Sequence, residues 1–128
     1  MKKLYLDVDG VILTNRNPRA ANGAIELINF ILSKFDFYWL TTHCRENNST
    51  NALRRLALYF PESVIEKLKQ IKPTQWNTLK TEAIDFNSDF YWLDDYVLEA
   101  EKRGLERHKC LQNLLLVDLM NDYELTYK

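Results

Sequence analysis

Four short runs of apolar residues divide the chain, and none of them alternates between apolar and polar positions. Alternation is expected of a strand with one face in water, whereas a continuously apolar run is typical of a strand covered on both faces of a parallel sheet. The runs span residues 4–6, 37–40, 90–93 and 114–117, and the residues directly after them are Asp7, Thr41, Asp94 and Asp118. The chain is therefore predicted to build a mainly parallel, Rossmann-like sheet.

Segments with helical periodicity lie between these runs. In residues 20–34 the apolar positions recur at the spacing of one helix face, and Pro61 suits the first turn of a helix at 62–70. Further helices are predicted at 49–59, 80–86 and 96–107. A short strand is an alternative within 66–73. Strands that alternate with helices predict an α/β fold, a three-layer α/β/α sandwich, in a single domain over residues 1–128.

Composition places the chain among ordinary globular proteins. A length of 128 residues suits one compact domain. A content of 46% hydrophobic and 27% charged residues excludes disordered and collagen-like chains. The formal net charge of −1 provides no overall field that would attract nucleic acid or anionic lipid. A nucleic-acid partner is therefore unsupported.

The cysteines and the N-terminus bear on localisation. Cys44 and Cys110 lie far apart and form no paired motif, which favours reduced thiols in a cytoplasmic protein. The apolar residues near the N-terminus are interrupted by Asp7 and Asp9, so they do not form the apolar region of a signal peptide. No run reaches the roughly 18 apolar residues that a membrane helix needs. We therefore expect a cytoplasmic protein without a membrane partner.

Two carboxylates stand one residue apart directly after the first apolar run, as Asp7 and Asp9, and Gly10 lets the chain turn away. Ligands bind beyond the carboxyl ends of the strands in sheets of this class. A plain Asp-Gly turn is the structural alternative. The spacing excludes an EF-hand calcium loop, which needs its glycine at position six and a glutamate at position twelve.

A second acid pair, Asp94 and Asp95, follows the third apolar run. Adjacent carboxylates at the end of a buried strand raise each other's pKa unless a cation is nearby. Mg²⁺ is the natural cation, because it is held by carboxylates, water and substrate phosphate oxygens. The alternative is that one of the two acids caps a helix that starts near Tyr96.

Polar side chains also follow the second apolar run. Thr41 and Thr42 stand where a hydroxyl and neighbouring backbone N–H groups can hold a phosphate. His43 and Arg45 come next and would lie close enough to touch a substrate. A solvated loop without a binding role is the alternative for this segment.

A phosphate site also needs a positive charge, and two lysines compete for that role. Lys72 and Lys80 both precede the third apolar run. Either of them, considered alone, would be an ordinary surface lysine.

Taken together, an acid pair, a hydroxyl, a lysine and a second acid pair closely resemble the four motifs of the haloacid dehalogenase-like (HAD) hydrolase superfamily. The resemblance runs from Leu4 to Asp95, which is most of the chain. Lys80 matches the lysine motif better than Lys72, because that motif stands at the start of a helix. The motifs are matched in order by Asp7 and Asp9, by Thr41, by Lys80, and by Asp94 and Asp95.

This resemblance implies hydrolysis of a phosphate ester through an aspartyl-phosphate, with Mg²⁺ as cofactor. Asp7 would be the nucleophile. Asp9 would be the general acid and base, and its backbone carbonyl would bind the metal. An acid at position 9 favours phosphate hydrolysis, because dehalogenating members of the family lack it.

The resemblance also assigns roles to the remaining candidates. Thr41 would hydrogen-bond the phosphoryl group, and Lys80 would neutralise it. The metal site would consist of Asp7, Asp9, Asp94 and Asp95, and the phosphate or substrate would meet Gly10, Thr41, Thr42, His43 and Arg45. Whether Asp94 or Asp95 ligates the metal directly stays open.

The spacing of the motifs leaves no room for the cap domain that many family members insert. Only 31 residues separate Asp9 from Thr41, and 38 separate Thr41 from Lys80. In this family an open, capless site accompanies phosphorylated substrates that are large, including macromolecules, or a lid supplied by a second subunit of a homo-oligomer. The alternative function is a non-catalytic module that binds Mg²⁺ and phosphate, or a partner protein, on the same fold.

Overall fold

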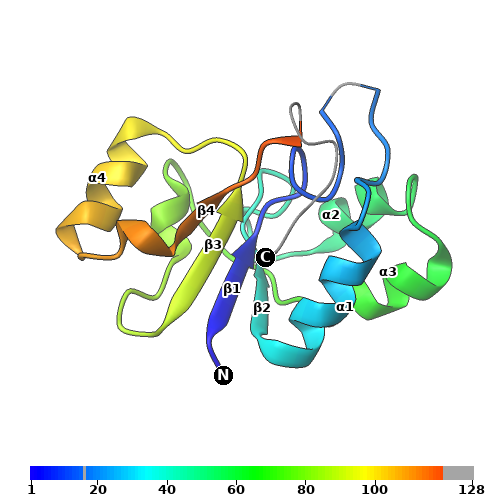
Figure 1. The fold of residues 1–128 in the computed structure, drawn as a ribbon, viewed down its shortest axis with the longest axis horizontal. Helices are drawn as coiled ribbons and strands as arrows, with labels where there is room; N and C mark the ends of the chain where they lie inside the picture. The colour runs from blue at the N-terminus through cyan, green and yellow to red at the C-terminus, as the bar shows by residue number, and fades with distance from the viewer. Residues whose placement is uncertain (16, 120–128) are drawn as a thin grey trace.

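The computed structural model describes residues 1–15 and 17–119, and a four-stranded parallel sheet lies at its centre (Figure 1). The strands are β1 (Lys3–Leu6), β2 (Asp36–Trp39), β3 (Phe90–Asp94) and β4 (Leu114–Leu116). The helices are α1 (Ala24–Lys34), α2 (Thr50–Leu56), α3 (Glu62–Leu68) and α4 (Glu99–Arg107), with 3₁₀ turns η1 (Lys80–Ala83) and η2 (Leu111–Asn113). The α/β class and the parallel sheet predicted from the four apolar runs are confirmed.

In the strand order β2-β1-β3-β4, the chain adds β2 on one side of β1 and then crosses to add β3 and β4 on the other side, so the order of the strands reverses next to β1. Ligands bind at such a reversal in open α/β sheets, beyond the carboxyl ends of the strands. Leu6 pairs with Trp39 on one side and with Leu93 on the other, so β1, β2 and β3 end nearly level. The segments that follow these three strands therefore meet along one edge of the sheet, the upper edge in Figure 1.

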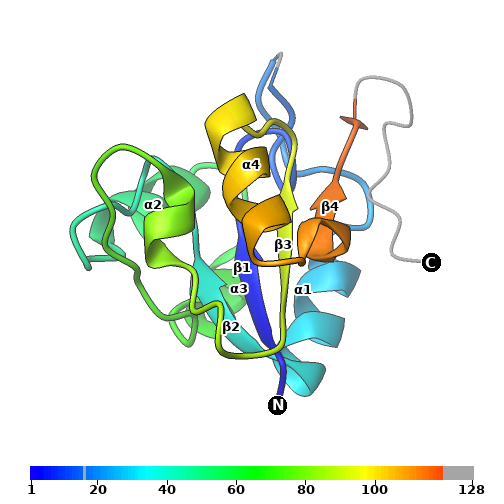
Figure 2. The ribbon, with the colours of Figure 1, turned by 90° about the vertical axis from the view of Figure 1, so that its left-hand side faces the viewer.

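Along β1, β2 and β3 both faces of the sheet are covered, largely by apolar side chains, which explains why these strand sequences do not alternate. The edge strand β4 differs from the prediction, because its Leu115 and Leu116 are exposed. On one face, Leu4 and Leu6 pack into a cluster with buried residues of α1, α2 and α3. On the other face, Tyr5 packs with Trp92 and with Leu105 of α4. Figures 1 and 2 show the same division, with α4 on one side of the sheet and α1 to α3 on the other.

The helix predicted at residues 80–86 is wrong, because the segment contains only the 3₁₀ turn η1. The side chain of Glu82 accepts backbone N–H groups of the three residues before the turn, Asn77, Thr78 and Leu79. The backbone N–H of Asp85 then donates to the hydroxyl of Tyr5 at 3.0 Å. These contacts close a tight turn and leave no length for an α-helix.

The other predicted helices are present but shorter than their sequence patterns. The α1 helix begins at Ala24, after Gly23 with its φ of 80°, and α4 begins at Glu99 and not at residue 96. The possible strand within 66–73 is a single parallel bridge between Lys72 and Tyr38. It places Lys72 beside the middle of β2, away from the edge where the strands end.

The described residues contain no helix with the length and apolar character needed to cross a membrane. Both cysteines, Cys44 and Cys110, are buried free thiols, as the sequence predicted.

Candidate functional site

Asp7 begins the loop that leaves β1 and is almost wholly buried. Its backbone N–H donates to the carbonyl of Leu93 in β3 at 3.0 Å, so the sheet pairing continues into the candidate site. Its carboxylate accepts the backbone N–H of Val8 at 2.8 Å. Asp7 is therefore held between β1 and β3, where the topology reverses.

Gly10 turns the loop so that it packs against the second acid pair. Its φ is +81°, a left-handed conformation that favours glycine. A Cβ built at this position would lie 2.2 Å from Oδ2 of Asp95 and 2.4 Å from its Cγ. A side chain at position 10 would force the Asp95 carboxylate to move, so the positive φ and this close approach both favour glycine here.

Lys80 connects the two acid pairs. Its ammonium lies 2.7 Å from Oδ2 of Asp94 and 3.4 Å from Oδ2 of Asp7, and all three side chains are largely buried. Although burial opposes the charge of Lys80, the carboxylates of Asp7 and Asp94 raise its pKa overall. Lys80 is therefore a charged lysine at the centre of the site.

Lys72, the competing lysine, lies elsewhere. Its ammonium pairs with Asp36 at the start of β2, at 2.6 Å, and lies over the ring of Tyr38. Because Asp36 is at the amino end of the strand, this pair is remote from the carboxyl edge. Lys80 is the lysine that the fold brings to the acids.

Burial and repulsion raise the pKa values of the acids. Burial raises the pKa of Asp7, and the Lys80 ammonium offsets this only in part. Burial, together with the nearby charge of Asp7, raises the pKa of Asp94 to about 6. Burial also raises the pKa of Asp95, and the hydrogen bond from Asn15 only partly offsets this. The raised pKa values mean that the ionised forms of these three carboxyl groups are unfavourable in the folded protein, and a bound cation besides Lys80 would stabilise them.

The structure gives Asp94 a different role from a helix cap. Its Oδ1 accepts the backbone N–H groups of Asp95 and Tyr96, at 2.8 and 3.2 Å, but α4 starts only at Glu99. Its Oδ2 accepts from Lys80 and from the indole of Trp92. The helix-cap alternative is therefore wrong, and Asp94 instead closes a turn while it holds Lys80.

Three carboxylates are placed so that they could hold a metal ion. One oxygen from each of Asp7, Asp94 and Asp95 can be chosen so that all lie within 4.8 Å of one another. Hard oxygen donors of this kind fit Mg²⁺ or Ca²⁺, and not the softer metals that prefer thiolate or imidazole. The carboxylate of Asp9 does not belong to this cluster.

The carboxylate of Asp9 lies between two basic side chains. Its Oδ2 lies 2.7 Å from Nε2 of His43, and its Oδ1 accepts from Nη2 and Nε of Arg55 at 2.9 and 3.2 Å. Partial burial raises the pKa of Asp9, but the hydrogen bonds from His43 and Arg55 more than offset this and lower it. At neutral pH Asp9 is an ionised group with a fixed orientation.

The residues after β2 are divided between the site and its surroundings. Thr41 is fully buried, its hydroxyl lowers the pKa of Asp7, and it accepts the backbone N–H of His43 at 3.3 Å. Thr42 is exposed and lines, with His43, a hollow of about 380 Å³. Arg45 lines the same hollow, but its guanidinium stacks on the ring of Trp76 and donates to the Asn77 carbonyl.

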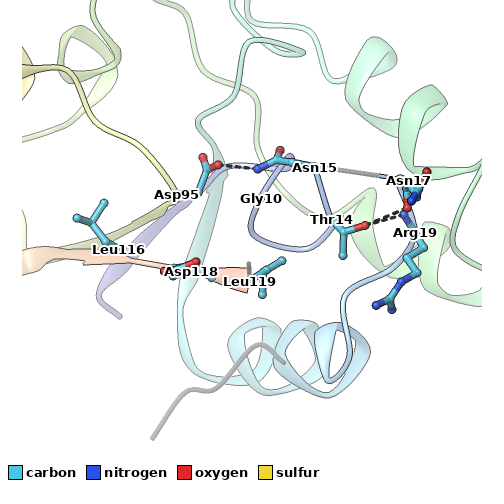
Figure 3. A pocket seen from close by; sticks show the side chains of 10 residues that line it. Gly10, Thr14, Asn15, Asn17, Arg19, Asp95, Leu116, Asp118 and Leu119 are labelled. Atoms are coloured by element: carbon cyan, nitrogen blue, oxygen red, sulfur yellow. Dashed lines mark hydrogen bonds between the residues drawn. The ribbon is translucent and has the colours of Figure 1, made fainter. Parts of the chain in front are cut away.

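A larger hollow of about 680 Å³ is lined by Gly10 and Asp95 of the acid loops and by residues of the segment after β4 (Figure 3). The amide of Asn15 donates to Oδ2 of Asp95 at 3.0 Å. Leu116 and Leu119 form an apolar part of its wall. The acid cluster therefore borders an open space on the β4 side.

Sequence reasoning missed several supporting residues. The buried Glu101 accepts the backbone N–H groups of Lys80 and Leu98, at 2.6 and 2.9 Å, and so ties α4 to the lysine. The available signal was a glutamate three residues after the N-cap residue Leu98. Arg55 and Asn15 gave no signal, because each meets its carboxylate across a long stretch of sequence.

The chain matches no family model, and searches of the curated proteins and of the solved structures likewise returned no match.

Proposed function

We propose that this protein is a Mg²⁺-dependent phosphomonoester hydrolase, a small HAD-like three-layer sandwich without a cap, that works through an aspartyl-phosphate on Asp7. The observation that carries the proposal is the position of Lys80, whose ammonium contacts Asp7 and Asp94 at the carboxyl edge of the sheet. A lysine in this position can neutralise an incoming phosphoryl group beside its nucleophile.

Asp7 and Asp95 would hold the metal, with the backbone carbonyl of Asp9, and Asp94 would lie beside them. When bound, Mg²⁺ would neutralise charge on the oxygens of the transferred phosphoryl group. Each oxygen of Asp94 already accepts two hydrogen bonds, whereas Asp95 accepts one from a side chain, that of Asn15. We infer that Asp95 ligates the metal directly and that Asp94 orients Lys80.

In the first step, a carboxylate oxygen of Asp7 attacks phosphorus in line with the leaving group. A bond forms between Asp7 and phosphorus as the ester P–O bond breaks, and its electron pair goes to the leaving oxygen. Asp9, which is ionised in the free protein, would take up a proton from solvent as the negatively charged phosphate binds beside it, and it then gives that proton to the leaving oxygen. Thr41 and Lys80 stabilise the charge that the phosphoryl group carries.

In the second step, water attacks the phosphorus of the Asp7 phosphate. Asp9, left ionised by the first step, accepts a proton from this water. The bond between Asp7 and phosphorus breaks, and its electron pair returns to the Asp7 carboxylate. Inorganic phosphate leaves, and both aspartates regain their starting states.

The elements between the motif residues support an open site. Between Asp9 and Thr41 the chain forms α1 and β2, and between Thr41 and Lys80 it forms α2 and α3. These elements belong to the sheet or pack on it. We therefore propose a phosphorylated substrate of unrestricted size, including a macromolecule, with a lid from a second copy as the other arrangement. The two free thiols fit a cytoplasmic location.

The test is phosphate release from p-nitrophenyl phosphate and from a panel of natural phosphomonoesters, with Mg²⁺ and with EDTA. We expect metal-dependent turnover that Asp7→Asn abolishes. A matched control is Asp89→Asn, because Asp89 is an exposed acid before β3, at the opposite end of the sheet. Mass spectrometry of acid-quenched protein should find a phosphoryl group on the peptide that contains Asp7.

Two results would contradict this proposal. One is the absence of turnover across the whole panel in a folded protein that binds Mg²⁺, which would favour a non-catalytic binding module. The other is turnover that survives Asp7→Asn.

A further inference from the structure

The carboxylate of Asp9 is held differently at its two oxygens. Oδ1 accepts two hydrogen bonds, from Nη2 and Nε of Arg55, at 2.9 and 3.2 Å. Within residues 1–15 and 17–119, the hydrogen-bond partner of Oδ2 is Nε2 of His43, at 2.7 Å. A carboxylate oxygen has two lone pairs, so Oδ1 is fully occupied and Oδ2 keeps one lone pair free.

This asymmetry decides which oxygen can exchange a proton with a substrate. A proton on Oδ1 would displace a charged donor, Arg55, whereas a proton on Oδ2 leaves both Arg55 contacts intact. Two N–H groups from one planar guanidinium also fix the rotation of the carboxylate more tightly than a single donor would. Arg55 therefore determines the direction in which Oδ2 points.

Arg55 is itself fixed by the element that carries it. It belongs to the last turn of α2, beside the buried Leu56, and its guanidinium lies over the ring of Tyr59, 5.7 Å from the ring centre. Its side chain is about 28% exposed, against 34% for Asp9. Its neighbour Arg54 is exposed and has the same charge, which provides a natural control.

We propose that Arg55 is a positioning residue for proton transfer: by occupying Oδ1 of Asp9 it directs Oδ2 toward the leaving-group oxygen of the phosphate ester. This role rests on the proposed function, because it assigns a supporting residue to the acid–base step of that reaction. The proton moves from Oδ2 of Asp9 to the ester oxygen as the ester P–O bond breaks. It is replaced on Oδ2 when water attacks the Asp7 phosphate.

The leaving group provides a readout that a purely structural role would not change. An alkoxide leaves only with a proton, so hydrolysis of an alkyl phosphate depends strongly on the general acid. A p-nitrophenolate leaves without one. If Oδ2 no longer points at the leaving oxygen, hydrolysis of an alkyl ester should therefore slow much more than hydrolysis of an aryl ester. A general loss of structure at the site should slow both reactions by the same factor.

The experiment compares kcat/KM for glycerol 2-phosphate and for p-nitrophenyl phosphate in the unchanged protein, Arg55→Gln, Arg55→Lys and Arg54→Gln. For Arg55→Gln we expect a loss of about 10²-fold on the alkyl ester, within the usual range for general acid catalysis, and less than about tenfold on the aryl ester. Arg55→Lys, which keeps the charge but loses the paired N–H geometry, should fall between. Arg54→Gln should change neither rate.

The proposal is overturned if Arg55→Gln reduces kcat/KM for both esters by the same factor or leaves both values unchanged. If Arg55→Gln does not fold, as judged by circular dichroism, Arg55→Lys decides by the same ratio of the two esters. The absence of turnover on either ester by the unchanged protein would contradict the proposed function itself, and the role of Arg55 with it. A selective loss on the alkyl ester supports both.

Discussion

The backbone of Gly10 lies against the carboxylate of Asp95 so closely that a Cβ at position 10 would be 2.2 Å from Oδ2. The two residues are 85 positions apart in the sequence: Gly10 directly follows the first acid pair, and Asp95 belongs to the second. Their contact fixes the spacing between the loop after β1 and the loop after β3. The geometry of the acid cluster therefore depends on a residue that carries no functional group.

We predict that Gly10→Ala lowers the free energy of unfolding by at least the roughly 1–3 kcal/mol typical of a strained backbone position. It should also weaken Mg²⁺ binding, because Asp95 must move to admit the methyl group. Chemical denaturation and isothermal titration calorimetry measure the two effects. Gly23→Ala is the control: Gly23 has the same positive φ but lies outside the acid cluster, so it should lose stability without losing metal affinity.

Replacing Lys80 should be costly, because it leaves two buried carboxylates facing each other. We expect Lys80→Met to lower the free energy of unfolding by about 3–5 kcal/mol, the usual cost of removing one partner of a buried ion pair. It should also abolish phosphate release. Lys72→Met should change the free energy of unfolding little, since the Lys72 ammonium is exposed and its pair with Asp36 is screened by solvent. Equal losses in the two variants, measured by urea denaturation, would contradict the central role of Lys80.

The pKa of Asp94 predicts how stability depends on pH. Burial and the charge of Asp7 raise the pKa of Asp94 to about 6, above its value in the unfolded chain. The native state thus binds the proton more tightly, so this group makes the protein less stable as pH rises from about 4 to above 6. A bound cation should remove this penalty. We expect Mg²⁺ to raise Tm more at pH 7.5 than at pH 5, and a larger increase at pH 5 would contradict the assignment.

Asp9 should behave in the opposite way. His43 and Arg55 overcome the effect of burial and lower the pKa of Asp9, so its contribution to stability is present above the pKa of the unfolded chain and is lost as pH falls through the folded value. Asp9→Asn should cost about 1 kcal/mol at pH 7, the order expected for a partly exposed, charge-assisted contact. The difference from the unchanged protein should disappear as the pH falls below the folded pKa of Asp9. The free energy of unfolding of both proteins, measured by urea denaturation at a series of pH values, tests this, and a difference that persists at the lowest pH would contradict the prediction.

Glu101 provides a test of the support behind the lysine. It is buried and accepts the backbone N–H groups of Lys80 and Leu98. We expect Glu101→Leu to leave both donors unsatisfied and to cost about 1–3 kcal/mol for each buried group. The activity should fall because Lys80 loses its anchor. Glu99→Leu, at the exposed start of the same helix, is the control and should leave the activity unchanged.

The sequence by itself determined the strands and the edge at which chemistry is expected. The strands observed match the continuous apolar runs to within about one residue at each end, and burial on both faces holds for β1 to β3 but not for the edge strand β4. Because parallel strands present their carboxyl ends on one side, Asp7, Thr41 and Asp94 had to lie along the same edge. This part of the site follows from local pattern and from one topological rule.

The tertiary structure decided which distant side chains meet at that edge. Lys72 and Lys80 are equivalent by residue type. The bridge to Tyr38 holds Lys72 away from the acids, whereas the η1 turn brings Lys80 to Asp94. The helix predicted at residues 80–86 is absent because the segment ends in a hydrogen bond to the hydroxyl of Tyr5 in β1, a contact that the helical periodicity of the segment does not report.

Arg55 is the clearest case of a contact that no local pattern encodes. It meets Asp9 across 46 positions. Helical and strand periodicities report which face of an element is buried, but they carry no information about the charged group that a neighbouring element presents there. The sequence pattern alone identified the acids of the site, whereas the packing of distant elements determined their partners, orientation and protonation.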